Sequence, residues 1–389
     1  MRHVTRVLSV VATVALGLSV VGVAQDRPIT AGTGPAFKYF GPLTAGPNGV
    51  VFAADSQDVS IYALEVGEAV KGGVSGTQAV PAIDQKIAAL LGTDVTGIEI
   101  TDALVYPATR NTLLSVMRGK GASASPALVK VDGAGTLTLV PLASVRYSRV
   151  MLPNPPPKAH QVGMGEKKYT IYNYPDRPKD DSMVGRILGT QTITDMAFDD
   201  GHLYVTGLSN EEFASKLRVI DYPFRNVDRG TSVEIWHGAH GQFETRSPVH
   251  SFVPYTVKGE RQIIASYTCT PLVKFPVSAL KPGADVRGVT IGEFGAGNRP
   301  LDMIVYTKAG QDYILMSTNF RGVLKAPTAG FAEVAPITTQ VDVSDRVGVV
   351  PETIKSLTGI EQLDKLDETR AVVLARQASA VDLQTIALP

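Results

Sequence analysis

The sequence predicts an all-β fold, a single β-propeller with six blades, on three observations. A module of polar loop, strand, Gly-containing turn, strand, loop and third strand occurs twice in succession, at 246–276 and 299–327. Repetition of one such unit is typical of a propeller. Glycine (37 residues) and proline (25 residues) are frequent, as a fold with many tight turns requires. Only two stretches, 81–91 and 352–357, have the pattern of a short helix among many strand-like runs, which argues against a parallel α/β sheet.

The composition limits the classes of function. Among the 389 residues, Lys plus Arg equal Asp plus Glu at 37 each, so no excess positive charge indicates binding to nucleic acid. The sequence has no Gly-rich phosphate loop, Gly-x-Ser-x-Gly elbow, paired-cysteine metal motif or c-type haem site. Its single cysteine, Cys269, excludes an intramolecular disulfide.

The N-terminus has the pattern of a secretory signal peptide, residues 1–24, followed by a leader, residues 25–40. The signal consists of a basic start (Arg2, His3, Arg6), an apolar run (Val7 to Val21) and small residues before the cleavage point (Gly22-Val23-Ala24). The apolar run is shorter than the roughly 20 residues of a spanning helix. We therefore expect a secreted or periplasmic protein with no membrane span after cleavage.

Residues 41–389 are expected to form the propeller, with insertions at about 68–97 and 146–190. The first blade begins with strands on either side of Asn48-Gly49, a strong hairpin signal because both residues tolerate positive φ. The stretch 81–91 follows as a short helix, with Ile83 and Ile87 on one face and Gly92 as its stop.

The remaining blades are recognised by the entry to their first strand. The expected entries are Thr44, Asp102, Asp195, His250, Asp302 and Glu361. The interval between Asp102 and Asp195 is much longer than the others, so it holds either a long insertion or a seventh blade. We favour six blades.

The blade entries define a first candidate site. Because first strands line the central channel, Asp102, Asp195, His250 and Asp302 are expected at one channel mouth. Carboxylates at that density repel one another unless a cation compensates them, and they would suit calcium. The alternative is that each aspartate bonds a turn or the backbone of the next blade.

A second candidate is the segment from Trp236 to Arg246. His237, His240 and Glu244 lie close together in it, and the glycines around His240 allow the loop to fold back so that all three reach one ion. A histidine is the usual proton carrier near neutral pH, so His237 and His240 are also the candidate catalytic residues. The alternative is a turn whose histidines bond backbone carbonyls.

Polar groups near the same channel face form a third set. The candidate ligand-binding residues are Arg118, Cys269, Arg299, Asn319 and Arg321. Cys269 is either a buried inert thiol or a soft metal ligand beside the histidines. The arginines and the amide either bind an anionic group or pair with the aspartates.

The pattern of apolar-Asp-apolar, turn and Leu-Tyr-Val at 44–64, 194–220 and 301–327 resembles the broad group of six-bladed propellers that includes NHL-repeat, strictosidine-synthase-like and gluconolactonase-like proteins. The resemblance implies a central divalent cation held by inner-strand side chains, as in the gluconolactonase-like members. Asp102, Asp195 and Asp302 occupy comparable positions, whereas His250 and Thr44 depart from that set.

Two hypotheses of function follow. One is a metal-dependent hydrolase with calcium or zinc as cofactor, copper or iron being alternatives. The other is a non-catalytic propeller that binds a small-molecule ligand or a partner protein on the channel face.

Overall fold

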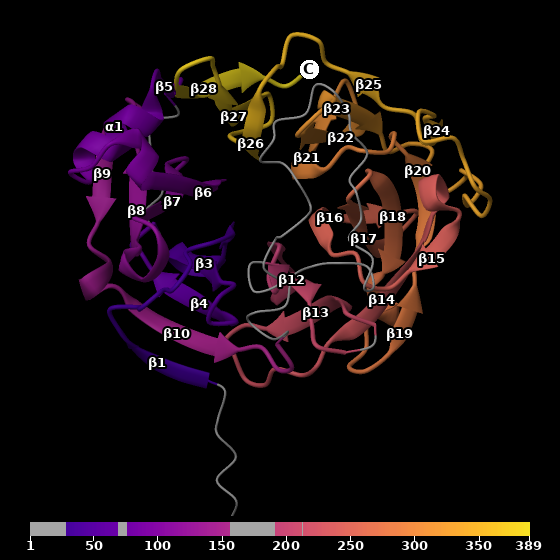
Figure 1. Ribbon diagram of the computed structural model, residues 1–389, viewed down its shortest axis with the longest axis horizontal. Coiled ribbons are helices and arrows are strands. Elements are labelled where there is room, and N and C mark those ends of the chain that lie inside the picture. Colours follow the sequence, from indigo (N-terminus) through magenta and orange to yellow (C-terminus); the bar gives the residue numbers. More distant parts are fainter. Residues whose placement is uncertain (1–28, 69–75, 156–190, 212) are drawn as a thin grey trace, which may run out of the picture.

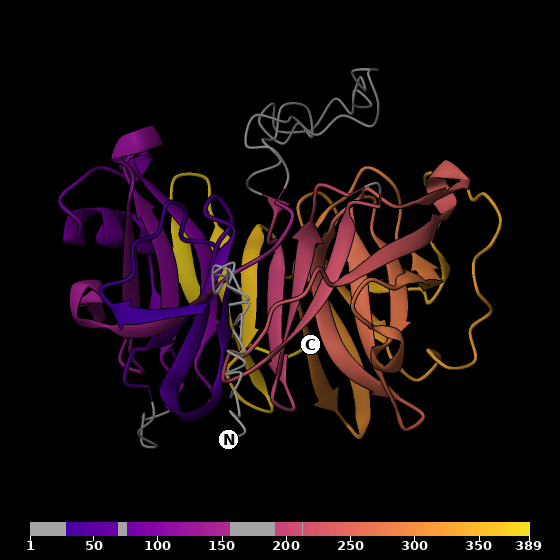
Figure 2. The same ribbon diagram turned by 90° about the horizontal axis from the view of Figure 1, so that it is seen from below.

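The structure is a computed structural model that describes residues 29–68, 76–155, 191–211 and 213–389. In these residues six sheets stand in a ring, each with its first strand toward the centre (Figure 1). The chain is a six-bladed β-propeller. The predicted fold class and blade number are therefore confirmed. Figure 2 shows the ring from its edge, with the blades standing side by side.

The first three blades contain the following strands. Blade 1 consists of β2 (Leu43–Ala45), β3 (Val50–Asp55), β4 (Ser60–Glu65), β10 (Arg146–Met151) and β1 (Ile29–Thr33). Blade 2 consists of β6 (Ile98–Val105), β7 (Thr112–Arg118), β8 (Ser125–Val131) and β9 (Leu137–Val140). Blade 3 consists of β11 (Asp195–Asp199), β12 (His202–Leu208), β13 (Ser215–Asp221), β14 (Thr231–His237) and β15 (Gln242–Glu244), with β19 (Asp285–Arg287) paired to β14.

The other three blades follow in the C-terminal half. Blade 4 consists of β16 (Val249–Val257), β17 (Glu260–Tyr267), β18 (Pro271–Pro276), β20 (Val289–Glu293) and β24 (Val347–Gly348). Blade 5 consists of β21 (Pro300–Lys308), β22 (Gln311–Thr318), β23 (Gly322–Pro327) and β25 (Glu352–Thr353). Blade 6 consists of β26 (Ile360–Lys365), β27 (Arg370–Arg376), β28 (Val381–Ala387) and β5 (Ala79–Val80).

All six predicted entry residues lie on innermost strands. They are Thr44 on β2, Asp102 on β6, Asp195 on β11, His250 on β16, Asp302 on β21 and Glu361 on β26. The predicted hairpin turn in blade 1 is also present, since Asn48 and Gly49 have φ of 53° and 84°. Inner-strand periodicity and turn chemistry were therefore sufficient to find each blade.

The order of the blades around the ring differs from their order along the chain. The inner strands lie against one another in the order β2, β6, β26, β21, β16, β11 and back to β2, which places blade 2 between blades 1 and 6 (Figure 1). After blade 2 the chain returns to blade 1, where β10 pairs with β4. Between blades 1 and 2, β5 pairs with β28 and completes blade 6. The two regions expected as insertions thus supply strands to other blades: β10 extends blade 1, and β5 ties the N-terminal half to blade 6 at the C-terminus.

The predicted short helix at 81–91 is present as α1 (Ile83–Leu90). Its apolar face, with Ile83 and Ile87 fully buried, packs into the core that blades 2 and 6 share. The second expected helix, at 352–357, is wrong. Glu352–Thr353 forms β25, because its backbone pairs with Leu324 and Lys325 of β23.

Some expectations fall on residues that the structure does not describe. The signal peptide at 1–24 and part of the insertion at 146–190 lie outside the described residues. Of the leader, Ile29–Thr33 forms β1, the outer edge of blade 1. No helix in the described ranges is long and apolar enough to cross a membrane.

Four inner-strand aspartates connect neighbouring blades. One carboxylate oxygen of each accepts a backbone N–H from the next inner strand: Asp102 from Leu43 (2.6 Å), Asp195 from Phe252 (2.9 Å), Asp302 from Leu363 (2.9 Å) and Asp364 from Val105 (2.7 Å). The other oxygen accepts the N–H of the following residue in its own strand. These contacts correspond to the structural alternative considered for the aspartates. A cation at this position stays a prediction.

The aspartates predict a pH dependence of stability. Burial, reinforced by the neighbouring carboxylates, raises the pKa of Asp102 and Asp195 to about 8. The unfolded chain loses these protons near pH 4 and the folded chain only near pH 8, so their contribution to stability declines across this interval. We expect the thermal unfolding midpoint to decrease as the pH rises from 5 to 8.5.

The double variant Asp102→Asn/Asp195→Asn should show a smaller decrease of the midpoint with pH, because the amide does not ionise and its oxygen still accepts one of the two backbone N–H groups. Thermal unfolding, followed by circular dichroism across this pH range, measures the midpoint of both proteins. The exposed Asp221→Asn serves as the control. An equal fall in the double variant and the native protein would show that the aspartates do not titrate as described.

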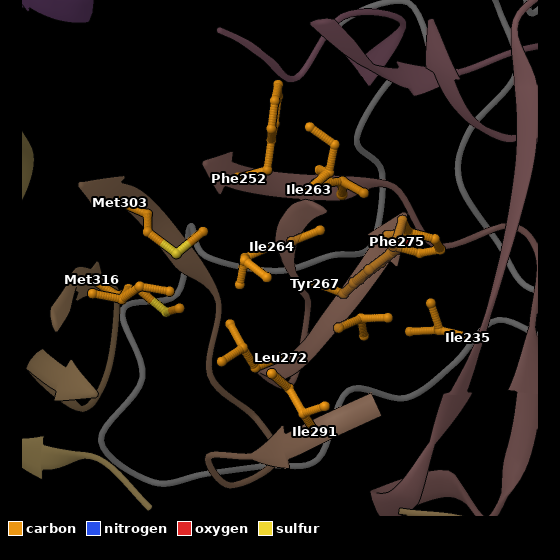
Figure 3. Close-up of a cluster of buried hydrophobic side chains, with 14 of the residues drawn as sticks. Ile235, Phe252, Ile263, Ile264, Tyr267, Leu272, Phe275, Ile291, Met303 and Met316 are labelled. Carbon is orange, nitrogen blue, oxygen red and sulfur yellow. The ribbon is translucent and has the colours of Figure 1, made fainter. Parts of the chain in front are cut away.

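The largest buried cluster joins blades 3, 4 and 5 (Figure 3). Ile264, Leu272 and Phe275 of blade 4 lie at its centre and are fully buried. Ile235 reaches it from β14 and Met303 from β21, so blade 4 is fixed on both of its faces. The outer strands of blade 3 are thereby held against the β17–β18 turn, which positions the candidate site.

Candidate metal centre

A tight hairpin at the outer edge of blade 3 assembles the histidines. β14 pairs with β15 so that His237 lies opposite Gln242, and a single 3-10 turn, Gly238–His240, connects them. Gly241 adopts φ of 63°, and its N–H donates to the carbonyl of His237 (2.9 Å). A glycine is favoured here because the turn needs a left-handed residue. The loop therefore folds back on itself, as predicted from its glycines.

Glu244 holds both imidazoles. Its Oε2 lies 3.0 Å from Nδ1 of His237, and its Oε1 lies 2.5 Å from Nδ1 of His240. Burial opposes ionisation of Glu244, but the bonds to His237 and His240 outweigh it and lower the pKa of the carboxyl to about 2. An ionised carboxylate accepts Nδ1–H from each ring, so each Nε2 becomes an electron-pair donor once it loses its own proton.

Cys269 faces the same histidines from blade 4. It lies in the turn between β17 and β18, and its φ of 66° and that of Thr270, 55°, bend this turn sharply. Its backbone N–H donates to the carbonyl of Asn298 (2.6 Å), and its Sγ accepts the N–H of Gly297 at 3.4 Å. The potential ligand atoms of His237, His240 and Cys269 all lie within 4.8 Å of one another.

The negative charges of Cys269 and Glu244 and the positive charges of the two histidines stabilise one another. Burial disfavours the Cys269 thiolate, but interaction with His237 and His240 outweighs it and lowers the pKa of the thiol to about 6. The pKa of His240 is raised to about 9, first by Cys269 and then by Glu244. For His237 burial acts in the opposite direction, yet Cys269 and Glu244 still raise its pKa to about 10. Near neutral pH the site therefore contains a thiolate beside two protonated imidazoles, and a metal ion would bind with release of their Nε2 protons.

Two further observations concern the fit of a metal ion. Nε2 of His237 is buried and has no hydrogen-bond partner among the described residues, although such atoms are nearly always paired. The thiol is covered by the small side chains of Ala239 and Ala296, and Cys269 is only 8% exposed. The His240 side chain, 27% exposed, lies at the edge that solvent reaches.

Glu293 is a member of the site that the sequence did not indicate. It ends β20 and is 1% exposed. Its Oε1 accepts the N–H of Gly238 (2.5 Å), whereas Oε2 has no partner in the described part of the chain. A Cβ at position 238 would lie 2.9 Å from Oε1, so the carboxyl of Glu293 would have to shift to accommodate a larger residue there. Burial raises the pKa of Glu293 to about 7, despite the nearby His237.

The structure separates the predicted residues into two places. His237, His240, Glu244 and Cys269 come together where blades 3 and 4 meet, with the β14–β15 hairpin at the outer edge of the ring (Figure 1). Asp102, Asp195 and Asp302 lie on inner strands instead. His250 contacts Thr268, next to Cys269, through Nε2 (2.9 Å), but it is not part of the ligand cluster.

The ligand-binding candidates are dispersed. Arg299 and Asn319 line a cavity of about 830 Å³ at the inner strands of blades 2, 5 and 6, together with Glu99, Glu361, Gln362 and Arg376. Arg321 lies nearer to Cys269, and its guanidinium donates to the carbonyl of Ala296 (3.3 Å). Arg118 is exposed at the end of β7, close to the carbonyl of Gly92 (3.5 Å).

Comparison with known protein sequences does not assign the chain to a family. No family model and no curated protein sequence matches the chain.

Solved structures with a similar course of the chain include a protein of unknown function from Bacteroides thetaiotaomicron, with 11% identity, 92% of this chain and 72% of that chain covered, and a TM-score of 0.33. A Thermus thermophilus protein described as an oxidoreductase (glucose dehydrogenase) has 11% identity, with 92% and 100% covered and a TM-score of 0.32. The PQQ-bound aldose sugar dehydrogenase of Streptomyces coelicolor has 10% identity, with 92% and 98% covered and a TM-score of 0.26. At such scores these likenesses say nothing of the reaction, and the propeller architecture rests on the six sheets themselves.

Proposed function

We propose that this protein is an exported metalloenzyme of the hydrolase class, with a zinc ion bound by Nε2 of His237, Nε2 of His240 and Sγ of Cys269. The observation that carries the proposal is the convergence of three ligand atoms within 4.8 Å in front of one carboxylate, Glu244, that orients both imidazoles. Carboxylates commonly stand behind zinc-binding histidines in this way.

The donor set favours zinc over calcium. Calcium takes six to eight oxygen ligands, whereas a thiolate and two imidazoles suit zinc or copper. Three protein ligands with a fourth position left open are characteristic of catalytic zinc sites. A zinc ion there would polarise a bound carbonyl group and lower the pKa of a water molecule.

The surrounding residues account for a hydrolytic role. Glu244 fixes the ring orientation, so His237 and His240 serve as ligands and not as the proton carriers expected from the sequence. Oε2 of Glu293 is buried and has no hydrogen-bond partner among the described residues. The Glu293 carboxyl interacts with His237, and with a pKa of about 7 it both accepts and returns protons near neutral pH. The residues Ala239 and Ala296 exclude bulk water from the thiolate side.

A Glu293→Gln variant tests the hydrolytic role. The amide oxygen can still accept the N–H of Gly238, so folding and zinc content should be unchanged. Hydrolysis of an activated ester such as p-nitrophenyl acetate should fall by about 10²–10⁴, the usual contribution of a general acid or base. Zinc-dependent hydrolysis at the native rate in this variant would exclude Glu293 as the proton carrier.

A second candidate function is supported by the cavity of about 830 Å³ at the inner strands. Its lining combines Arg299, Asn319, Gln362 and Glu361 with apolar side chains, as is usual in small-molecule sites. A non-catalytic propeller would bind its ligand or partner there. Substitution Asn319→Ala would then abolish ligand binding while zinc content stays unchanged.

A further inference from the structure

Arg218 is a buried cation that the mechanism above does not use. It lies on β13 of blade 3, is 1% exposed and is the largest fully buried side chain of the described residues. Nε, Nη1 and Nη2 of its guanidinium have no hydrogen-bond partner in the described ranges. Arginine side chains have five N–H donors and are rarely buried without an acceptor.

An unpaired guanidinium in this position is energetically unfavourable. Burial lowers the pKa of Arg218 to about 10, so the group is still charged at neutral pH. Glu211 and Asp228 attract it at a distance without contacting it. A charge that is buried without a partner is strongly unfavourable, so this environment favours a bound anionic acceptor.

A second buried cation stands beside it. Lys216, two residues earlier on the same face of β13, is also 1% exposed. Its Nζ donates to Oε2 of Glu211 (2.6 Å) and to Oγ of Ser232 (2.7 Å). Glu211 is thus the only carboxylate that contacts this pair among the described residues, and the pair has an excess of positive charge.

The backbone around Arg218 is adapted to this arrangement. Gly230 faces it from the start of β14 and has φ of 73°. A Cβ at this position would lie 2.6 Å from Cγ of Arg218. Asp228 accepts the N–H of Gly230 (2.6 Å) and holds this turn. The glycine therefore allows the arginine side chain to pack along the strand.

A cavity of about 390 Å³ at the outer strands of blade 3 lies beside Ser232, which contacts Lys216. It is lined by Phe213, Ser232, Glu234, Asp285, Val286 and Arg287. Ser232 is the residue whose hydroxyl contacts Nζ of Lys216, so the wall of the cavity and the cation pair share one side chain. Arg287, on the strand paired with β14, forms an ion pair with Glu234 (2.6 Å) in the same lining.

We propose that Lys216 and Arg218 form a binding site for the carboxylate or phosphate group of a small anion that enters beside Ser232. The planar guanidinium provides parallel N–H donors that match two oxygens of such a group, and the ammonium provides a third donor. Glu234 and Asp285 in the lining of the cavity disfavour polyanions, so the site selects a small anion or one that also carries a positive group.

Calorimetric titration of the full chain with inorganic phosphate and with succinate, at constant ionic strength in chloride, tests the proposal. Saturable binding of one anion per chain is expected, with a rise in the thermal unfolding midpoint. Which of the two binds identifies phosphate or carboxylate as the preferred group.

The variants Arg218→Met and Lys216→Met each remove one positive charge and keep an unbranched side chain of similar length. Binding should weaken at least about tenfold in each, whereas the exposed Arg146→Gln should bind as the native protein does. In chloride alone Arg218→Met should unfold at a temperature no lower than the native chain, because an apolar residue replaces an unpaired charge.

Two results would overturn the proposal. One is the absence of saturable binding of either anion by the native protein, a result that does not depend on any variant folding. The other is binding of equal affinity by the native protein and by both methionine variants.

Discussion

Replacing Cys269 by serine is expected to weaken zinc binding by more than roughly 100-fold, the upper range for loss of a group that only supports a ligand. The thiolate is the softest of the three donors and the one with an unusually low pKa, about 6. A serine hydroxyl does not ionise near neutral pH and is a poor zinc ligand. Competition with a chromophoric chelator measures the affinity of both proteins.

Matched variants separate the metal site from general effects. Glu244→Gln should weaken zinc binding by roughly 10–100-fold, because one carboxylate orients both imidazoles. His202→Ala removes an exposed histidine that is paired with Asp221 on another strand of blade 3, and it should leave the affinity unchanged. Equal zinc affinities for Cys269→Ser and the native protein would mean that the thiol is not a ligand.

Replacing Phe275 by alanine is expected to lower the free energy of unfolding by about 3–5 kcal/mol. Phe275 is fully buried in the cluster of blades 3, 4 and 5 shown in Figure 3. Its ring packs over Gly288, where an added Cβ would lie 2.4 Å from the ring carbons. The surrounding strands are fixed by their ladders, so the resulting cavity cannot close fully.

Urea-induced unfolding followed by fluorescence measures this loss. Val350→Ala is the control, since Val350 is 56% exposed and its truncation should change stability by no more than about 0.5 kcal/mol. Similar losses in the two variants would show that blade 4 does not depend on this cluster.

The sequence was sufficient to locate the six blades but not to predict which distant strands complete blades 1 and 6. The residues at the strand entries, Asp102, Asp195 and Asp302, recur because each of them accepts a backbone N–H from the inner strand of a neighbouring blade. Repeat spacing gives the number of blades. It does not indicate that β10 returns to blade 1 or that β5 completes blade 6, because both strands lie far along the chain from the rest of these blades and neither has a distinctive composition.

Part of the candidate site was predictable because several of its residues are close together in the sequence. His237, His240 and Glu244 are close in sequence, so loop geometry alone suggested that they meet. Cys269 was considered beside them because its turn faces the same end of the propeller. Glu293 had no signal, since a single Glu at a strand end is commonplace and its burial depends on Gly238 from another blade.

The measurement that tests the central claim most directly is elemental analysis of the mature protein, purified without chelator or an affinity-tag metal, beside the His237→Ala/His240→Ala variant. About one zinc ion per native chain and none in the variant is the result expected from the cluster of His237, His240 and Cys269. Zinc retained at full content in the variant, or no metal in the native protein even after zinc is supplied, would contradict it.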